Sequence, residues 1–284
     1  MRRIAIAAAI LSSWLGFHGF AQAPAAPVDV APATVVRVPS ASLEREQVAT
    51  VLLPDGYTSS RQRYPVLYLL HGGGQDHTAF AARRWFRTLA SRNMIVVTPS
   101  VGESWYVNSV VDPSAKYEDF VVKDLIAFVD ANYRTVATRE GRAVAGVSMG
   151  AWGAMLLGLK HHHLFVAIGA MSAPFGISRQ DPNMDMKSRT QQRFGAPATP
   201  ERLARDPATL ASTIPVDSFP LLYLASGNQD IFAADNRRFV ERLTTRKIPY
   251  EYRELSPFGH SWDVWDGQVV SFVDVIAVRW RTVQ

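Results

Sequence analysis

The stretch Arg142-Ala143-Val144-Ala145-Gly146-Val147-Ser148-Met149-Gly150 decides the fold. An apolar run that predicts a strand leads into Gly-x-Ser-x-Gly, and a run that favours a helix follows from Ala151 to about His162. Glycine at both flanks permits a turn too tight for side chains, and such a turn exposes the serine hydroxyl at the top of a sheet. The alternative is a glycine-rich connection with an incidental serine. The strand before the turn and the helix after it favour a nucleophile.

Outward from this turn, strand and helix patterns alternate along the chain. Continuous apolar runs predict strands buried on both faces of a sheet, and helical spacing predicts the segments between them. The predicted strands are 65–70, 94–98, 165–170, 221–225 and 250–255, and the predicted helices are 80–91, 117–133, 232–246 and 261–280. Extended segments at 34–38 and 44–53 predict an antiparallel pair at a sheet edge. The alternation predicts an α/β fold with a mostly parallel central sheet and helices on both faces.

The first 23 residues have the pattern of a secretory signal peptide. Arg2-Arg3 supplies the positive start, an apolar segment runs from Ile4 to about Leu15, and Ala21-Gln22-Ala23 is an A-x-A cleavage site. A membrane anchor is the alternative, but the apolar run is shorter than the roughly 20 residues that span a bilayer. We expect cleavage after Ala23, a flexible lead-in at 24–33, and one catalytic domain at 34–284.

Composition restricts the class of protein. Hydrophobic residues make up 48% and charged residues 19%, an ordinary globular balance. The net charge of +5 becomes about +3 without Arg2 and Arg3, and no basic block indicates nucleic acid as a partner. The chain has no cysteine, which excludes disulfides and lipid attachment at cysteine. Together with the signal peptide, this predicts a protein secreted or held in a bacterial periplasm. No later run is long enough to predict a membrane span.

Serine is a weak nucleophile unless a base lies within reach and a third group orients that base. Two late positions suit these roles. Asp230 follows the strand at 221–225 through a short turn, and His260 follows the next strand. The order Ser148, Asp230, His260 is that of α/β-hydrolases. The alternatives are a helix N-cap for Asp230 and a loop histidine for His260. The rival acids are Asp206, Asp217 and Asp235, of which Asp235 is expected to point to solvent from a helix.

Two loops after strands are candidates for the rest of the site. His71 is followed by three glycines, whose N–H groups can donate to an oxyanion unless the loop is merely flexible. Trp105 and Tyr106 follow the strand at 94–98, at the edge where ligands bind in open α/β sheets. They are predicted to line a substrate pocket together with Trp152 and Trp262, and packing at the sheet edge is the alternative. The polar, proline-containing segment 176–217 predicts a cap-like excursion of short helices.

The chain resembles the esterase D-type α/β-hydrolases, the putative-esterase family. This family includes S-formylglutathione hydrolases, feruloyl and acetyl-xylan esterases, tributyrin esterases and mycolyltransferases. Five stretches carry the resemblance: 64–72 (YPVLYLLHG), 104–106 (SWY), 146–150 (GVSMG), 226–230 (SGNQD) and 259–262 (GHSW), the last followed by Trp265. The resemblance implies an α/β-hydrolase fold and the triad Ser148, Asp230 and His260. It also implies oxyanion donors at Met149 and at Gly72 or Gly73. Where many relatives have Gly-Gly-His, this chain has Phe258-Gly259-His260.

The sequence therefore predicts an exported serine carboxylesterase for short-chain or compact aromatic acyl esters. The expected substrate is a small-molecule or carbohydrate-linked ester, and no metal or organic cofactor is implied. Acyl transfer to a sugar or lipid acceptor uses the same triad and stays open as an alternative. A non-catalytic carbohydrate or surface binder on a hydrolase scaffold is the third hypothesis. The signal peptide and the absence of cysteine weigh against a cytosolic glutathione thioester hydrolase.

Overall fold

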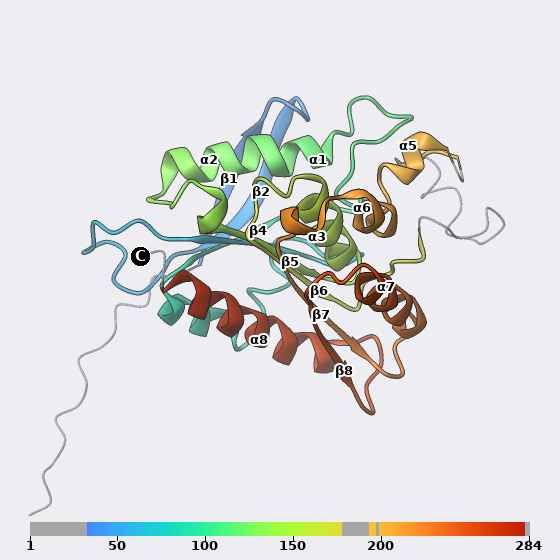
Figure 1. Cartoon of the computed structure of the whole chain (residues 1–284). Coiled ribbons are helices and arrows are strands. Elements are labelled where there is room, and N and C mark those ends of the chain that lie inside the picture. The colour runs from blue at the N-terminus through green and yellow to red at the C-terminus, as the bar shows by residue number, and fades with distance from the viewer. Residues whose placement is uncertain (1–32, 178–192, 197–198, 282–284) are drawn as a thin grey trace, which may run out of the picture.

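The computed structural model describes residues 33–177, 193–196 and 199–281, which form an eight-stranded sheet in the order β1-β2-β4-β3-β5-β6-β7-β8 (Figure 1). The strands are β1 (Thr34–Ser40), β2 (Arg45–Leu52), β3 (Val66–Leu70), β4 (Ile95–Pro99), β5 (Arg142–Val147), β6 (Ala167–Met171), β7 (Leu221–Gly227) and β8 (Glu251–Leu255). Strands β3 to β8 pair in parallel, whereas β1 and β2 pair antiparallel at the edge. The predicted edge pair and the predicted mostly parallel sheet are both confirmed.

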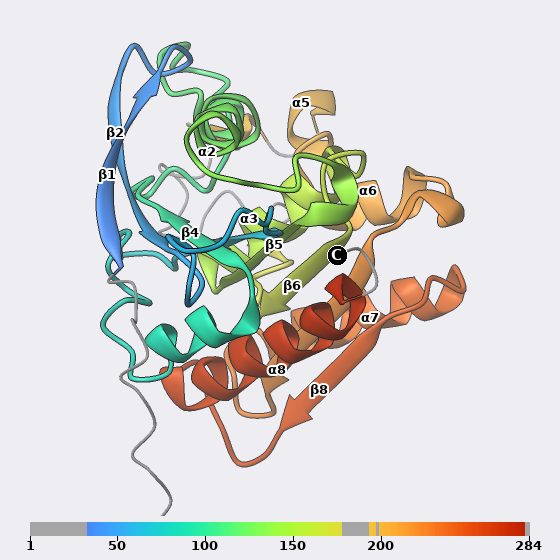
Figure 2. The same ribbon diagram turned by 90° about the vertical axis from the view of Figure 1, so that its left-hand side faces the viewer.

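Helices cover both faces of the sheet, because each central strand is apolar on both sides. In β3, Val66, Tyr68 and Leu70 pack in the core of one face, while Leu67 and Leu69 pack in the core of the other. The first face is covered by α2 (Ile126–Asn132), α3 (Met149–Lys160) and α7 (Ala233–Thr245), and the second by α8 (Trp262–Trp280). Figures 1 and 2 show α2 and α3 on one side of the sheet and α8 on the other.

Two predicted helices differ in the structure. The helix predicted at 80–91 is a series of turns that ends in a 3₁₀ helix, Phe86–Arg92. The tighter 3₁₀ winding aligns residues three apart, so Phe86 and Leu89 are both buried against the sheet. The helix predicted at 117–133 is one helical run in three parts: α1 (Tyr117–Asp119), a π-helical segment at Phe120–Leu125, and α2. The spacing of apolar residues at 117–133 did not indicate the wider, π-helical turns in the middle of this helix.

The described part of the 176–217 excursion contains short helices joined by loops. They are α5 (Pro200–Leu203), α6 (Pro207–Thr213) and a 3₁₀ turn at Val216–Ser218. Helix α6 packs against α3 and α7 on the same face of the sheet. Residues 178–192 and 197–198 lie outside the described residues, as do the predicted signal peptide and nearly all of the lead-in. The capping role of the excursion stays a prediction.

Among the described residues, no helix combines the length and the apolar character that crossing a bilayer requires.

Candidate active site

Ser148 stands at a strained turn between β5 and α3. Its backbone has φ 54° and ψ −121°, outside the regions that side-chain-bearing residues usually occupy. Glycine is required on both sides of it. A Cβ atom at Gly146 would collide with the backbone of Gly150, and one at Gly150 would collide with the carbonyl of Leu70. Strain of this kind costs about 1–3 kcal/mol and persists at functional sites, where it aims a side chain at a ligand.

His260 contacts both Ser148 and Asp230. Its Nε2 atom lies 2.9 Å from Ser148 Oγ, and its Nδ1 atom lies 3.0 and 3.1 Å from the two carboxylate oxygens of Asp230. The rings of Phe232 and Trp265 stand edge-on to the imidazole, with centroids 5.1 and 4.9 Å away. A hydroxyl, a base and an orienting carboxylate thus form one hydrogen-bonded chain, the arrangement that serine needs to act as a nucleophile.

The Asp230 carboxylate is fully buried, yet it is held in the charged form. Burial raises the pKa of Asp230, but hydrogen bonds from the His260 ring and the Phe232 N–H lower it more, so the net pKa lies below the usual value for aspartate. A carboxylate that stays ionised can stabilise a positively charged imidazole. Asp230 lies three residues beyond the end of β7, at the carboxyl edge of the sheet.

The three rival acids are placed elsewhere. Asp206 caps the N-terminus of α6, where its carboxylate accepts hydrogen bonds from the Ala208 and Thr209 N–H groups. Asp217 is exposed in the 3₁₀ turn that precedes β7. The prediction that Asp235 points to solvent is wrong, because its carboxylate accepts a hydrogen bond from the Gly176 N–H and pairs with Arg238. The carboxylates of Asp206 and Asp235 are thus held by other groups.

The glycines after His71 lie against the serine. A Cβ atom at Gly72 would lie 3.3 Å from that of Ser148. The Gly72 N–H donates to Gln75 Oε1 at 2.9 Å and the Gly74 N–H donates to the Glu103 carboxylate. In the part of the chain that the structure describes, the Gly73 N–H has no acceptor.

Of the two predicted glycines, Gly73 is the one with an available N–H, because the Gly72 N–H already donates to the Gln75 side chain. The second available donor is the N–H of Met149. Met149 is the first residue of α3, and the first N–H groups of a helix have no partner within it. Sequence reasoning missed Gln75 and Glu103. The signal that could have found them is their position, since both are polar residues in loops that directly follow parallel strands.

Three further hydrogen bonds fix the loop that begins at His71. The His71 Nδ1–H donates to the Gly72 carbonyl at 2.8 Å, and Nε2 accepts from the Val101 N–H at 3.2 Å. The Tyr106 hydroxyl donates to the His71 carbonyl at 2.9 Å. Burial lowers the pKa of His71, which keeps the ring neutral and able to accept at Nε2. The loop after β4 thereby supports the loop after β3.

The predicted pocket aromatics are mostly packing residues. Tyr106 and Trp152 are fully buried, so the prediction that they line a substrate pocket is wrong. The Trp152 ring packs against Phe194, 4.9 Å between centroids, and edge-on against Trp105, which is 8% exposed. These side chains instead fill the space beside α3. Trp262 is partly exposed two residues after His260, where it packs edge-on against Trp265.

The sequence of this chain is similar to those of several known esterases. The family model described as "Putative esterase" matches residues 40–273. Esterase Rv1288 of Mycobacterium tuberculosis is 34% identical over 244 residues, which cover 74% of this chain and 51% of that protein. The chain thus spans about half the length of this relative. An acetyl esterase of Caldicellulosiruptor saccharolyticus is 27% identical over 215 residues, 72% of this chain and 80% of its own.

A solved structure of a ferulic acid esterase superposes with a TM-score of 0.74 at 25% identity. It covers 88% of this chain and 98% of its own. The predicted α/β-hydrolase fold is confirmed by this match together with the sheet.

Proposed function

Because the chain belongs to the putative-esterase family, we propose that it is an exported serine esterase that cleaves short-chain or compact aromatic carboxylic esters. The observation that carries this proposal is the position of His260, within hydrogen-bond distance of both Ser148 and Asp230. The family supports ester hydrolysis as the reaction. Export rests on the signal-peptide pattern of residues 1–23 alone.

In the first half of the reaction, His260 Nε2 takes the hydroxyl proton of Ser148 as Oγ attacks the ester carbonyl carbon. The carbonyl oxygen becomes an oxyanion and accepts hydrogen bonds from the N–H groups of Met149 and Gly73. Loss of one such donor costs about 3–4 kcal/mol in known hydrolases. Asp230 holds the imidazole in place and stabilises its charged form. The C–O bond then breaks, and His260 returns the proton to the leaving alcohol.

In the second half, a water molecule takes the place of the alcohol. His260 removes a proton from the water as its oxygen attacks the acyl carbon bound to Ser148. The tetrahedral intermediate uses the same two N–H donors. When it collapses, the acid is released and Ser148 regains its proton from His260. These steps need only groups of this chain and water.

The substrate class is supported by the relatives. An acetyl esterase removes a short acyl group, and a ferulic acid esterase acts on a compact aromatic one. Tyr106 and Trp152 lie inside the protein, so their rings do not shape a substrate pocket. The proposed substrate class therefore rests on the relatives and not on the shape of a pocket.

A panel of esters tests the proposal: p-nitrophenyl esters of rising chain length, methyl ferulate and acetylated xylan. We expect kcat/KM to be higher for C2–C4 esters or methyl ferulate than for C12 esters. A higher kcat/KM on C12 esters would contradict the substrate class. Added acceptor alcohols would reveal acyl transfer as a transferred product. A complete absence of turnover and of labelling by a fluorophosphonate would favour the non-catalytic binder.

A further inference from the structure

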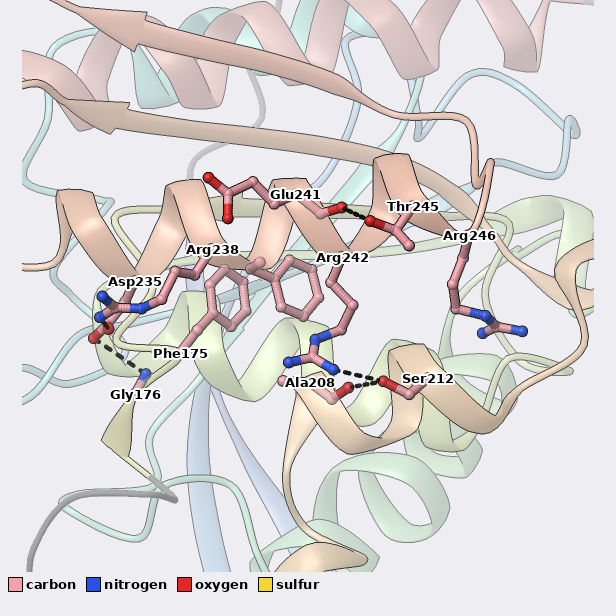
Figure 3. Close-up of a pocket in the computed structure, with 11 residues that line it drawn as sticks. Phe175, Gly176, Ala208, Ser212, Asp235, Arg238, Glu241, Arg242, Thr245 and Arg246 are labelled. Carbon is pink, nitrogen blue, oxygen red and sulfur yellow. Dashed lines mark hydrogen bonds and ion pairs between the residues drawn. The ribbon is translucent and has the colours of Figure 1, made fainter.

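A groove of about 900 Å³ lies between α6 and α7, and none of Ser148, Asp230 and His260 lines it (Figure 3). Its walls come from Ala208 and Ser212 of α6, from the residues after β6, and from one side of α7. Its floor includes the rings of Phe175 and Phe239, which stack 3.9 Å apart at 10°. The reaction described above uses no residue of this groove.

Three arginines follow one another along the groove, Arg238, Arg242 and Arg246. Residues four apart lie on the same side of a helix, about 6 Å from one to the next, so the three side chains leave α7 and its C-cap on the side of the groove. In Figure 3 the Arg242 guanidinium points toward Ser212 of α6, whereas that of Arg238 turns toward Asp235. The two acids of the groove are Asp235 and Glu241, and the Glu241 carboxylate points away from Arg242 (Figure 3).

Two of the three arginines have partners within the fold that explain their positions. Arg238 forms an ion pair with Asp235, one turn earlier in α7. Arg246 donates from Nη1 to the Ala211 carbonyl at 2.6 Å and from Nη2 to the Ile214 carbonyl at 3.0 Å. These carbonyls lie at the C-terminal end of α6, where a cation is favoured. Arg246 therefore holds α6 against α7.

Arg242 has neither an acidic partner nor a pair of carbonyl acceptors among the described residues. Its Nη1 atom donates to Ser212 Oγ at 2.9 Å, and among the described residues it has no carboxylate partner. Its Nε–H is buried and, within the same residues, has no acceptor. A buried donor without an acceptor is costly, but Nε is closed to solvent and therefore also to a ligand in the groove. In the part of the chain that the structure describes, the Nη2 atom has no hydrogen bond, so its N–H groups are the donors that a carboxylate or phosphate in the groove can engage.

We propose that this groove binds an anionic small ligand through a carboxylate or phosphate group held by Arg242. Ser212 offers a hydroxyl beside Arg242, and Arg238, which is paired with Asp235, adds positive charge at the same groove. The groove is separate from the triad, but the helix that lines it is close to the triad in sequence, because α7 begins three residues after Asp230. The proposal goes beyond the esterase function and does not depend on it.

Isothermal titration of the full chain with inorganic phosphate and with D-glucuronate tests the proposal, with chloride at equal ionic strength as the reference. We expect binding of at least one of them to the wild type, weakened about tenfold or more in Arg242→Met because charge-assisted bonds are lost. Arg242→Lys keeps the charge but not the paired donors, so it should fall between the two. Arg37→Met is the matched control, since Arg37 lies on β1 at the opposite edge of the sheet. Its affinity should equal that of the wild type.

Two results would overturn the proposal. One is no heat of binding to the wild type for either anion up to about 50 mM. The other is equal affinity in Arg242→Met and the wild type together with lower stability of the variant, which would make Arg242 only a link between α6 and α7.

If Arg242→Met fails to fold, a measurement on the wild type alone still tests the proposal. Phenylglyoxal modifies accessible arginines, and peptide mass mapping locates the modified residues. We expect a saturating concentration of at least one of the two anions, phosphate or D-glucuronate, to protect Arg242 and leave Arg37 reactive. Equal modification of Arg242 with and without each of these anions would contradict the proposal.

Discussion

The Nε2 atom of His260 lies 2.9 Å from the hydroxyl oxygen of Ser148, although 112 residues separate the two in the sequence. The sheet accounts for this contact. Strands β5, β6, β7 and β8 are parallel neighbours in the same order as in the sequence, so they end at one edge. Ser148 follows β5, and Asp230 and His260 follow β7 and β8. Because the three side chains act as a unit, their substitutions are expected to be far from additive.

Asp230→Asn should reduce kcat on p-nitrophenyl acetate by up to about 10⁴-fold, the effect of the same change in a well-studied serine protease. The amide keeps the shape of the carboxylate but permits the wrong imidazole tautomer and removes the charge that stabilises imidazolium. Steady-state kinetics with circular dichroism as the folding check measures this. A folded variant with near-normal kcat would show that Asp230 is not the orienting acid.

Asp206→Ala should show the opposite pattern. Its carboxylate caps α6, so the free energy of unfolding should fall by about 1 kcal/mol while kcat changes little. Urea unfolding and kinetics on the same preparation separate the two effects. A large loss of kcat with unchanged stability would make Asp206 a functional acid after all.

Glu103→Ala should lower kcat about tenfold or more with little change in KM, because the Gly74 N–H loses its acceptor and the neighbouring Gly73 N–H moves. Glu103→Gln keeps an oxygen acceptor and should restore most of kcat. Asp217→Asn, an exposed acid, is the control. If the glutamine variant is as slow as the alanine variant, the hydrogen bond to Gly74 is not what matters.

Tyr106→Phe should cost about 1 kcal/mol of stability, since a buried hydroxyl that donates to the His71 carbonyl is lost. Because Tyr106 is fully buried, KM should not change for acetyl or feruloyl esters. Urea unfolding and ester kinetics check both points. A raised KM for feruloyl esters at unchanged stability would restore Tyr106 as a substrate contact.

Because His71 is buried, we expect the free energy of unfolding to fall in acid. Burial lowers the pKa of His71 in the folded protein, whereas the unfolded chain takes up this proton near pH 6.5. Below that pH the unfolded state binds more protons than the folded one, so stability falls as the pH falls through the folded pKa. The contribution is fully present above the unfolded pKa. Urea unfolding at pH 7.5 and pH 5 measures the change.

The matched variant is His71→Gln, which can still accept from the Val101 N–H but cannot titrate. It should lose less stability between the two pH values than the wild type. Equal losses would remove His71 as a source of the pH dependence.

The sequence predicted the fold and the residues of the candidate triad well, because their signals are local. Alternation of apolar and helical runs fixes the layers. Ser148, Asp230 and His260 each follow the end of a strand within five residues, and the ends of parallel strands meet at one edge. The cap at Asp206 also had a local signal, since Asp followed by Pro is a typical helix start.

What the sequence could not predict depends on side chains from distant loops. Whether Tyr106 faces a pocket or the interior depends on His71, 35 residues away. Which glycine N–H is available depends on Gln75 and Glu103. The arginine groove forms only when α6 and α7 pack side by side, and no pattern within either helix shows that contact.

The central claim is that Ser148 is the nucleophile of an esterase, and the direct measurement is kcat of Ser148→Ala on p-nitrophenyl acetate. Removal of the nucleophile typically costs on the order of 10⁶ in rate, so we expect no detectable turnover from a variant with the circular dichroism spectrum and unfolding midpoint of the wild type. Activity within about tenfold of the wild type would contradict the account.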